Sequence, residues 1–205
     1  ALHNQIDIAP LPVVAEFDFP DRFLRLSNFG IASFGPAYSV ILKSKVTLDA
    51  LAGRQIGIID ETSTSVRLLK VLLEETQSKN SAIRFGPIGP GNDAILLIGD
   101  KALGDARPST KYPVVLDLAD EWKKVTGLPF VFALWYTTPE VSQAHRDRIG
   151  SYLGRNLTAN LADLNHIQQC RSELNMGLEQ MTSYIRSFIY RLNDAEFQGL
   201  EHFRK

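Results

Sequence analysis

Residues 114–138, VVLDLADEWKKVTGLPFVFALWYTT, contain the pattern that decides the fold class of this chain. The apolar residues 114–116 predict a short strand, and the helical spacing that follows can be closed at Gly127 in a left-handed conformation. Residues 128–138 are the most strand-like stretch of the whole chain, because they are rich in aromatic and β-branched residues. A strand, a helix and a second strand in such close succession are typical of a sheet with helices packed on it.

The same alternation continues on the N-terminal side of this stretch. In residues 61–75, ETSTSVRLLKVLLEE, Thr62 or Ser63 can cap a helix whose leucines and valines repeat with helical spacing. We therefore expect an α/β protein with a parallel or mixed sheet and helices on both faces. Apolar runs bounded by turn residues predict further strands at residues 6–14, 39–45, 55–60, 82–88 and 94–100.

The C-terminal part of the chain is expected to be helical. Residues 138–140, Thr-Pro-Glu, have the order of a helix start, with a cap, a proline in the first turn and an acid near the positive end of the helix dipole. Helical spacing then continues over residues 139–173, with a break near 156–160. Residues 176–192 predict another helix, and Asp194 is expected to cap a last short one.

The composition of the 205-residue chain is that of an ordinary globular protein, with 44% hydrophobic and 22% charged residues. This length suits one large domain or two small ones. A formal net charge of -1 excludes the electrostatic footprint of a protein that binds nucleic acid or an anionic membrane. No run approaches the roughly 20 apolar residues of a membrane span. The single cysteine, Cys170, excludes an intramolecular disulfide, and its helical setting predicts a buried, structural residue.

The richest group of polar residues is the strand-to-helix turn at residues 60–65, Asp-Glu-Thr-Ser-Thr-Ser. Free N–H groups at a helix N-terminus, together with several hydroxyls, form a site for a carboxylate or a phosphate. A plain helix cap is the alternative, although these polar residues are more than one cap needs. The GxxxxGK[ST] motif of a Walker loop is absent, so that class of phosphate site is excluded.

Two other loops are candidates for ligand binding. In residues 33–39, SFGPAYS, a Gly-Pro turn with hydroxyls on both sides leads into a strand, which fits either a binding loop or an ordinary turn. Gly99 and Asp100 follow an apolar strand at its carboxyl end, where ligands of open α/β sheets bind. Asp100 can equally cap the helix that begins after it.

Motifs of metal and nucleophile chemistry are absent from the sequence. None of the four histidines lies at a metal-binding spacing from another histidine or from Cys170, and there is no HExxH motif. The GxSxG and GxGxxG patterns are missing as well. The residues by themselves therefore predict an α/β protein that binds a small anion.

Four stretches resemble the chorismate dehydratase family of the futalosine route to menaquinone. They are GPAYSVILKSK, DETSTSVRLLKVLLEE, DAILLIGDKAL and DLADEWKKVTGLPFVFALW, at residues 35–45, 60–75, 93–103 and 117–135. The resemblance implies the two-lobed α/β fold of type II periplasmic binding proteins, with the ligand in the cleft and a helical C-terminal tail. It assigns residues 1–40 and 136–205 to one lobe and residues 41–135 to the other. It also implies a cytoplasmic protein, despite the name of the fold.

The resemblance further implies a reaction and a set of site residues. Members of the family are lyases that remove water from chorismate to give 3-[(1-carboxyvinyl)oxy]benzoate, with no cofactor. Ser39 is the expected catalytic residue, as a hydrogen-bonding partner of the leaving hydroxyl. No acidic or histidine side chain in these loops stands out as a base, so the substrate's own carboxylate is expected to take the proton. The implied substrate-binding residues are Ser63, Thr64 and Ser65 around one carboxylate, Ser33 and Gly35 on the opposite wall together with Ser39, and in addition Pro36 and Asp100.

The start of the chain departs from the family. Members open with a strand and a loop that carries Asn in a pattern like SYLNTLP, which this chain lacks, and residues 9–12, Ala-Pro-Leu-Pro, replace small polar residues. The first residues, ALHNQIDIAP, resemble a helix end followed by a strand and lack the pattern of a signal peptide. We therefore expect that an N-terminal segment is missing.

Two other functions stay open at this point. One is a non-catalytic protein of the same fold that binds a small carboxylate, as a solute-binding protein or a sensor. The other is a related enzyme for another enolpyruvyl or aromatic carboxylate. In each case the expected partner is a small molecule, chorismate in the first place, with no nucleic acid and no membrane, and the sequence does not set the oligomeric state.

Overall fold

The computed structural model describes residues 6–59, 63–76 and 83–205. The chain divides into two compact units, which we call unit 1 (Ala1–Ser33 with Phe130–Lys205) and unit 2 (Phe34–Pro129). The resemblance places the lobe limits after residues 40 and 135, whereas the two units meet after Ser33 and Pro129. The structure assigns the Gly-Pro loop to the unit whose strand it enters.

Unit 2 is built on a five-stranded mixed sheet in the order β5-β4-β6-β3-β7. β4 pairs in parallel with β5 and β6, whereas β3 runs antiparallel to β6 and β7. The prediction of an α/β protein with a parallel or mixed sheet is thus confirmed. The strands are β3 (Val40–Ser44), β4 (Gln55–Ile58), β5 (Arg84–Pro87), β6 (Ala94–Ile98) and β7 (Val114–Asp117), with one 3-10 turn at Leu48–Ala50.

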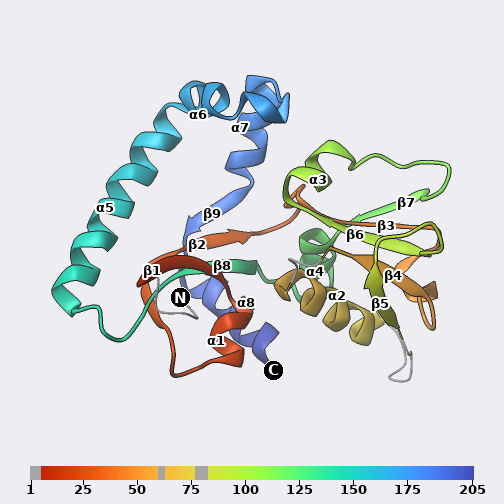
Figure 1. Cartoon of the computed structure of the whole chain (residues 1–205), viewed down its shortest axis with the longest axis horizontal. Coiled ribbons are helices and arrows are strands. Elements are labelled where there is room, and N and C mark those ends of the chain that lie inside the picture. The colour runs from red at the N-terminus through yellow and green to blue at the C-terminus, as the bar shows by residue number, and fades with distance from the viewer. Residues whose placement is uncertain (1–5, 60–62, 77–82) are drawn as a thin grey trace. The chain divides into compact units, whose positions relative to one another are not determined.

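Helices cover both faces of this sheet (Figure 1). α2 (Ser63–Thr76) and α4 (Leu118–Thr126) pack on one face, and the short α3 (Gly99–Gly104) lies on the other. On the α3 face, alternate residues of β3 and β6 form an apolar cluster with Ala102 and Tyr112. On the α2 and α4 face, the helices contribute side chains that are at most 1% exposed, namely Leu68, Leu69, Leu72, Leu118 and Trp122.

The local signals in residues 114–138 fold as the sequence indicates. Asp117 caps α4, because its side chain accepts hydrogen bonds from Ala119 N and Asp120 N. Gly127 ends the helix in the left-handed conformation, with φ of 69°, as predicted. Trp122 is 1% exposed and its indole N–H donates to Pro129 O at 3.3 Å. The indole hydrogen bond ties α4 to Pro129, the last residue of unit 2.

Unit 1 contains a four-stranded antiparallel sheet in the order β1-β8-β2-β9. β2 is a strand that the sequence patterns did not indicate, and it lies between β8 and β9. The two strands β2 and β8 approach so closely at Gly30 that an added Cβ would lie 2.6 Å from Ala133 O. The strands are β1 (Ile8–Pro12), β2 (Leu24–Ser33), β8 (Phe130–Thr137) and β9 (Phe188–Arg191).

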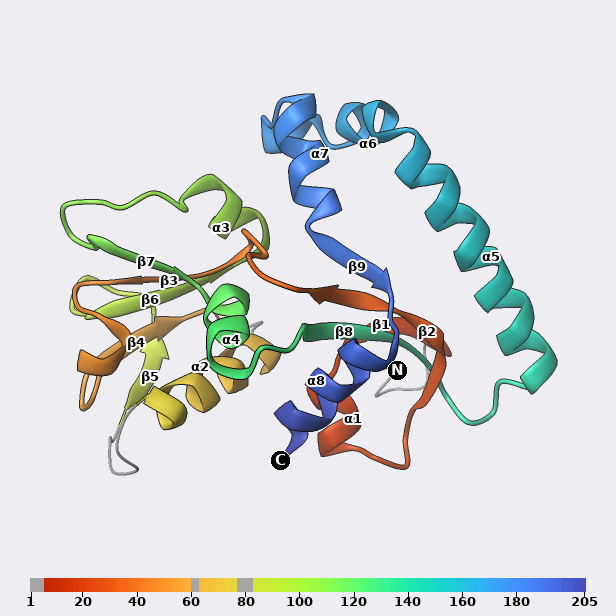
Figure 2. The ribbon, with the colours of Figure 1, turned by 180° about the vertical axis from the view of Figure 1, so that it is seen from behind.

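The helices of unit 1 are α1 (Val14–Asp18), α5 (Gln143–Ala162), α6 (Leu164–Cys170), α7 (Leu178–Arg186) and α8 (Asp194–Arg204), with a 3-10 turn at Ser172–Leu174. α1 and α8 lie side by side against the sheet (Figure 2), where Phe17 and Phe203 have ring centroids 5.8 Å apart. α8 also contacts β8, and Phe203 packs 4.9 Å from Phe130. No helix in the described ranges has the length and apolar character that a membrane span requires.

Several expectations for the C-terminal part were wrong in detail. The helix starts after Ser142, whose hydroxyl accepts from His145 N, instead of at residues 138–140, and it ends at Ala162 rather than near 156–160. The expected helix over 176–192 ends at Arg186. The following residues instead pair with β2, because a long-range strand partner overrides local helical spacing.

Two single residues in this part also differ from expectation. The last helix is capped from Asn193, whose backbone N–H donates to Glu196 at 2.7 Å, and Asp194 is its first residue. Cys170 is exposed and not buried; it is the last residue of the short helix α6, where the chain leaves the helix.

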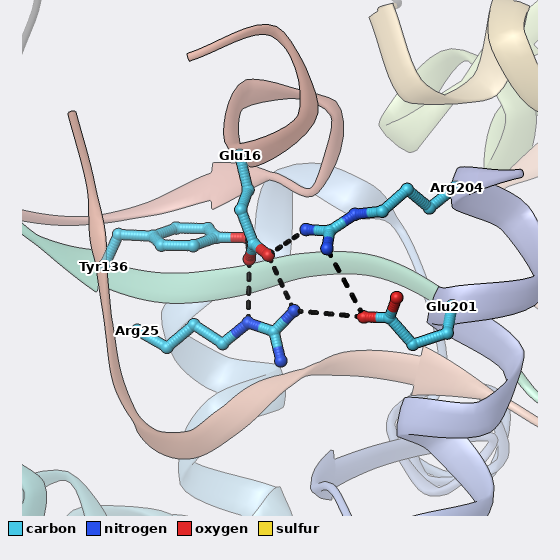
Figure 3. Close-up of polar contacts among 5 residues, drawn as sticks. All are labelled: Glu16, Arg25, Tyr136, Glu201 and Arg204. Atoms are coloured by element: carbon cyan, nitrogen blue, oxygen red, sulfur yellow. Dashed lines mark hydrogen bonds and ion pairs between the residues drawn. The ribbon is translucent and has the colours of Figure 1, made fainter. Parts of the chain in front are cut away.

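A carboxylate with several donors ties four elements of unit 1 together (Figure 3). Glu16 of α1 accepts two hydrogen bonds from Arg25 of β2, at 2.7 Å each, and one from Tyr136 of β8 at 3.0 Å. Arg204 of α8 also donates to Glu16. Burial alone would raise the pKa of Glu16, but the hydrogen bonds and positive charges of these partners outweigh it, and the pKa is lowered. We call these residues, with Glu201, the Glu16 network.

Candidate functional site

The register of the unit 2 sheet gathers the predicted binding loops at one edge. β4 and β6 are parallel, so the segments that follow them, α2 and Gly99, both leave the sheet there. β3 is antiparallel to β6, and the Gly99 N–H donates to Ser39 O at 2.8 Å. β7 ends at the same edge, because Ile41 pairs with Asp117. Ligands of open α/β sheets bind at such an edge, outside the carboxyl ends of the strands.

The loop that enters β3 has an unusual backbone. Gly35 has φ of 123° and Tyr38 has φ of 60°, in the region that residues with a side chain rarely occupy. Strained residues of this kind gather at functional sites. Ser39 is 7% exposed, and its hydroxyl donates to Ala37 O at 3.2 Å. Ser39 therefore has its proton engaged in a long hydrogen bond, while its oxygen lone pairs stay available.

The start of α2 contains a buried hydroxyl without a partner. Thr64 and Ser65 are 6% and 8% exposed, whereas Ser63 is exposed. Within the described residues, Thr64 Oγ1 has no hydrogen-bond partner. Leaving a buried hydroxyl unpaired costs about 1–3 kcal/mol, so a ligand that supplies an acceptor is favoured here. The rest of the predicted turn, residues 60–62, lies outside the described residues.

The remaining predicted residues have different surroundings. Gly35 is buried and Pro36 is exposed in the loop before β3, and Asp100 is exposed in the first turn of α3. Ser33 belongs to unit 1, where it is 1% exposed and pairs with Phe130 and Phe188. Within unit 2, the described predicted residues thus lie at one edge of the sheet.

Two charged residues at this edge escaped the sequence patterns. Lys123 of α4 has its ammonium group 4.2 Å from the centroid of the Phe34 ring, and it would lie 3.9 Å from a Cβ on Gly35. Among the described residues it makes no ion pair. It is therefore a positive charge beside the loop, available to an anion.

The second missed residue is Asp117, which accepts hydrogen bonds from the loop as well as from α4. Its Oδ2 accepts from Tyr38 N at 2.6 Å. Burial raises the pKa of Asp117, and the backbone amides that donate to it, including that of Ala37, oppose this rise without cancelling it. An acidic residue between a strand and a helix was the only signal in the sequence, and it indicates no more than a cap.

A groove lies in unit 1, and its lining contains none of the predicted residues. It has a volume of about 1010 Å³ between β2 and α5, with Arg25, Arg146, Arg155 and Arg191 in its lining. Most of these cations already have partners: Arg25 donates to Glu16, and Arg146 and Arg191 donate to backbone carbonyls. We therefore favour the edge of the unit 2 sheet as the site.

Metal chemistry has no visible basis in the described part of the chain. No group of three or more histidine, cysteine, aspartate or glutamate side chains could hold a metal ion there.

Comparison with known sequences gives a family. A family model described as menaquinone biosynthesis matches residues 1–205. The chorismate dehydratase of Thermus thermophilus is 31% identical over 201 residues, which cover 87% of this chain and 71% of that protein.

Comparison with solved structures supports the fold. A protein from Archaeoglobus fulgidus has a TM-score of 0.63 at 18% identity, covering 98% of this chain and 78% of that one. The periplasmic aliphatic sulphonate binding protein of Escherichia coli has a TM-score of 0.56 at 14% identity, covering 97% and 72%. The α/β fold of type II periplasmic binding proteins, with helices at the C-terminus, is thus confirmed.

Proposed function

The chain belongs to the menaquinone biosynthesis family, and from that premise we propose that it is a chorismate dehydratase of the cytoplasm. The reaction is the removal of water from chorismate to give 3-[(1-carboxyvinyl)oxy]benzoate. The observation that carries the proposal is the buried hydroxyl of Thr64 at the start of α2, which has no hydrogen-bond partner among the described residues, in a chain 31% identical to a chorismate dehydratase.

The start of α2 is the place for one carboxylate of the substrate. α2 has 14 residues, long enough for its first N–H groups to carry an effective positive charge. Thr64 Oγ1 donates a further hydrogen bond, and a carboxylate supplies the acceptor that the hydroxyl lacks. A hydrogen bond to a charged group contributes about 1.5–3 kcal/mol.

The loop before β3 is the place for the other end of the substrate. Lys123 adds a positive charge beside Gly35, which suits the second carboxylate of chorismate. Holding both carboxylates fixes the ring in one orientation. Orientation supplies much of the rate enhancement in a reaction that requires no strong acid or base from the protein.

Ser39 acts on the leaving group. The proton on ring C3 is lost and the C4 hydroxyl departs with it as water, while the ring becomes aromatic. Rotation of the Ser39 hydroxyl away from Ala37 O lets it donate to the departing oxygen, and the 3.2 Å bond is long enough to exchange easily. In this scheme the substrate's own carboxylate accepts the C3 proton and passes it to the departing hydroxide, so that the leaving group is water and the carboxylate is regenerated.

The first test is an incubation of the purified protein with chorismate, with chromatography of the aromatic enolpyruvyl ether. Product at a rate well above the protein-free control supports the dehydratase. Chorismate that raises the melting temperature without forming product would point to a non-catalytic carboxylate-binding protein of the same fold. If chorismate gives no product and also does not bind, both functions are refuted.

A matched pair of variants tests the role of Thr64. Thr64→Val removes a buried hydroxyl that has no partner, so the melting temperature should hold or rise, whereas KM for chorismate should rise roughly 10-fold or more. Thr137→Val is the control, because Thr137 Oγ1 is also buried and unpartnered in the described structure but lies in β8 of unit 1. An unchanged KM in Thr64→Val, or an equal rise in both variants, would refute the assigned role.

A further inference from the structure

Asp117 does more than cap a helix. One carboxylate oxygen, Oδ1, accepts from Ala119 N at 3.0 Å and from Asp120 N at 3.3 Å, which is what a helix cap requires. The other oxygen, Oδ2, accepts from Tyr38 N at 2.6 Å, across 79 positions of the sequence. The carboxylate therefore joins the start of α4 to the loop before β3.

The loop needs this contact because of its backbone. Tyr38 has φ of 60°, and a left-handed conformation at a residue with a side chain costs roughly 1–2 kcal/mol. The Tyr38 side chain is 49% exposed, so packing of its ring offsets little of that cost. A short hydrogen bond from the backbone N–H to a carboxylate is charge-assisted and is strong enough to hold the conformation.

The peptide held by Asp117 leads directly into Ser39. The conformation of Tyr38 sets the direction in which the Ser39 side chain leaves the backbone, and two further bonds complete the placement. Ser39 Oγ donates to Ala37 O, and Ser39 O accepts from Gly99 N. Of these anchors, the one through Asp117 uses a side chain other than that of Ser39, so it can be removed by a substitution that leaves Ser39 in place.

We propose that Asp117 is the positioning residue of the active site, whose carboxylate fixes Tyr38 and thereby aims the Ser39 hydroxyl at the leaving oxygen of the substrate. This inference rests on the proposed dehydratase function. Asp117 itself touches no substrate in this scheme. It affects the rate at which bound chorismate reacts and not the affinity for chorismate, because the carboxylates of the substrate are held by α2 and Lys123.

Asp117→Asn separates the two tasks of the residue. Asparagine caps a helix as well as aspartate does, so its carbonyl oxygen still accepts the hydrogen bonds from Ala119 N and Asp120 N of α4. Its NH2 group then faces the Tyr38 N–H, donor against donor, and the contact to the loop is lost. A misplacement on the order of 1 Å can reduce a rate about 100-fold. We expect kcat to fall roughly 10- to 100-fold and KM for chorismate to change less than about 3-fold.

The matched control is Asp120→Asn, which removes the same charge in the first turn of the same helix. The Asp120 carboxylate pairs with Lys124 at 2.8 Å on the surface of α4. Its kcat should stay within about 2-fold of wild type, since exposed ion pairs contribute little. An equal loss in both variants would mean a general effect of charge or helix stability and would overturn the proposal.

Hydrogen exchange gives a readout that does not depend on activity. In Asp117→Asn the amides of residues 37–39 should exchange faster, while those of α4 keep the protection of wild type. Unchanged exchange in the loop, or unchanged kcat, would overturn the proposal. So would a general loss of protection across unit 2, because the role would then be structural. A wild-type protein without dehydratase activity would instead refute the proposed function, and the exchange comparison would still decide whether Asp117 holds the loop.

Discussion

The Glu16 network predicts that Glu16→Gln is among the most destabilising single-atom changes in unit 1. The Glu16 side chain is only 12% exposed and accepts from Arg25, Tyr136 and Arg204 (Figure 3). Gln keeps the shape but replaces one acceptor oxygen by a donor that faces a guanidinium.

The magnitude follows from the exposure of the partners. Breaking a fully buried ion pair costs about 3–5 kcal/mol, because the remaining charge has no partner. Here the side chains of Arg25 and Arg204 are 32% and 40% exposed, and both keep Glu201 at 3.7 and 3.6 Å. Solvent and Glu201 reduce the loss, and we expect about 2–3 kcal/mol. For a chain of this size that corresponds to a fall in melting temperature on the order of 5–10 °C.

The assay is thermal unfolding at neutral pH, with Glu201→Gln as the matched control. Glu201 binds the same two arginines, but it is 52% exposed and its contacts are long. Its loss should cost less than about 1 kcal/mol. A melting temperature of Glu16→Gln within about 2 °C of wild type, or an equal fall in both variants, would refute the reasoning.

The same residue gives a pH dependence with a definite sign. The pKa of Glu16 is lowered in the folded protein, so the folded state binds its proton less readily than the unfolded state does. The contribution of Glu16 to stability is therefore complete above the unfolded pKa of about 4.3, and it is lost as the pH falls from there through the folded pKa. Unfolding in denaturant at pH 7 and at pH values below about 4 should show the difference between wild type and Glu16→Gln shrinking with acidity. A difference that grows toward low pH would contradict the assignment.

Two further substitutions follow from single contacts. Lys123→Met should raise KM for chorismate roughly 10-fold, because it removes the positive charge beside Gly35. The melting temperature should stay unchanged, because the Lys123 ammonium group has no ion pair within the described residues. Lys124→Met, which loses surface ion pairs only, is the control in steady-state kinetics. Gly30→Ala should lower the free energy of unfolding by about 1–3 kcal/mol, measured in denaturant, because the new Cβ would lie 2.6 Å from Ala133 O in the backbone of β8. A variant as stable as wild type would mean that β2 and β8 can move apart at this position.

The elements that the sequence determined are those whose signals lie within one or two turns of chain. Gly127 ends α4 as predicted, because a left-handed glycine closes its own helix, and the cap that Asp117 forms is equally local, since it bonds N–H groups two and three residues away. The apolar repeat of α2 is local in the same sense, and the polar residues at its start include Thr64, on whose hydroxyl the proposed function rests.

Tertiary structure alone decided what depends on a distant partner. Residues 188–191 have helical spacing, yet they are a strand because β2 offers them backbone hydrogen bonds. Arg204 reaches Glu16 across 188 positions, and Tyr38 reaches Asp117 across 79. Lys123 lies beside Gly35 only because α4 packs along the start of β3. The residue types were visible in the sequence, but the energy of each contact depends on a separation in space that only the folded sheet sets.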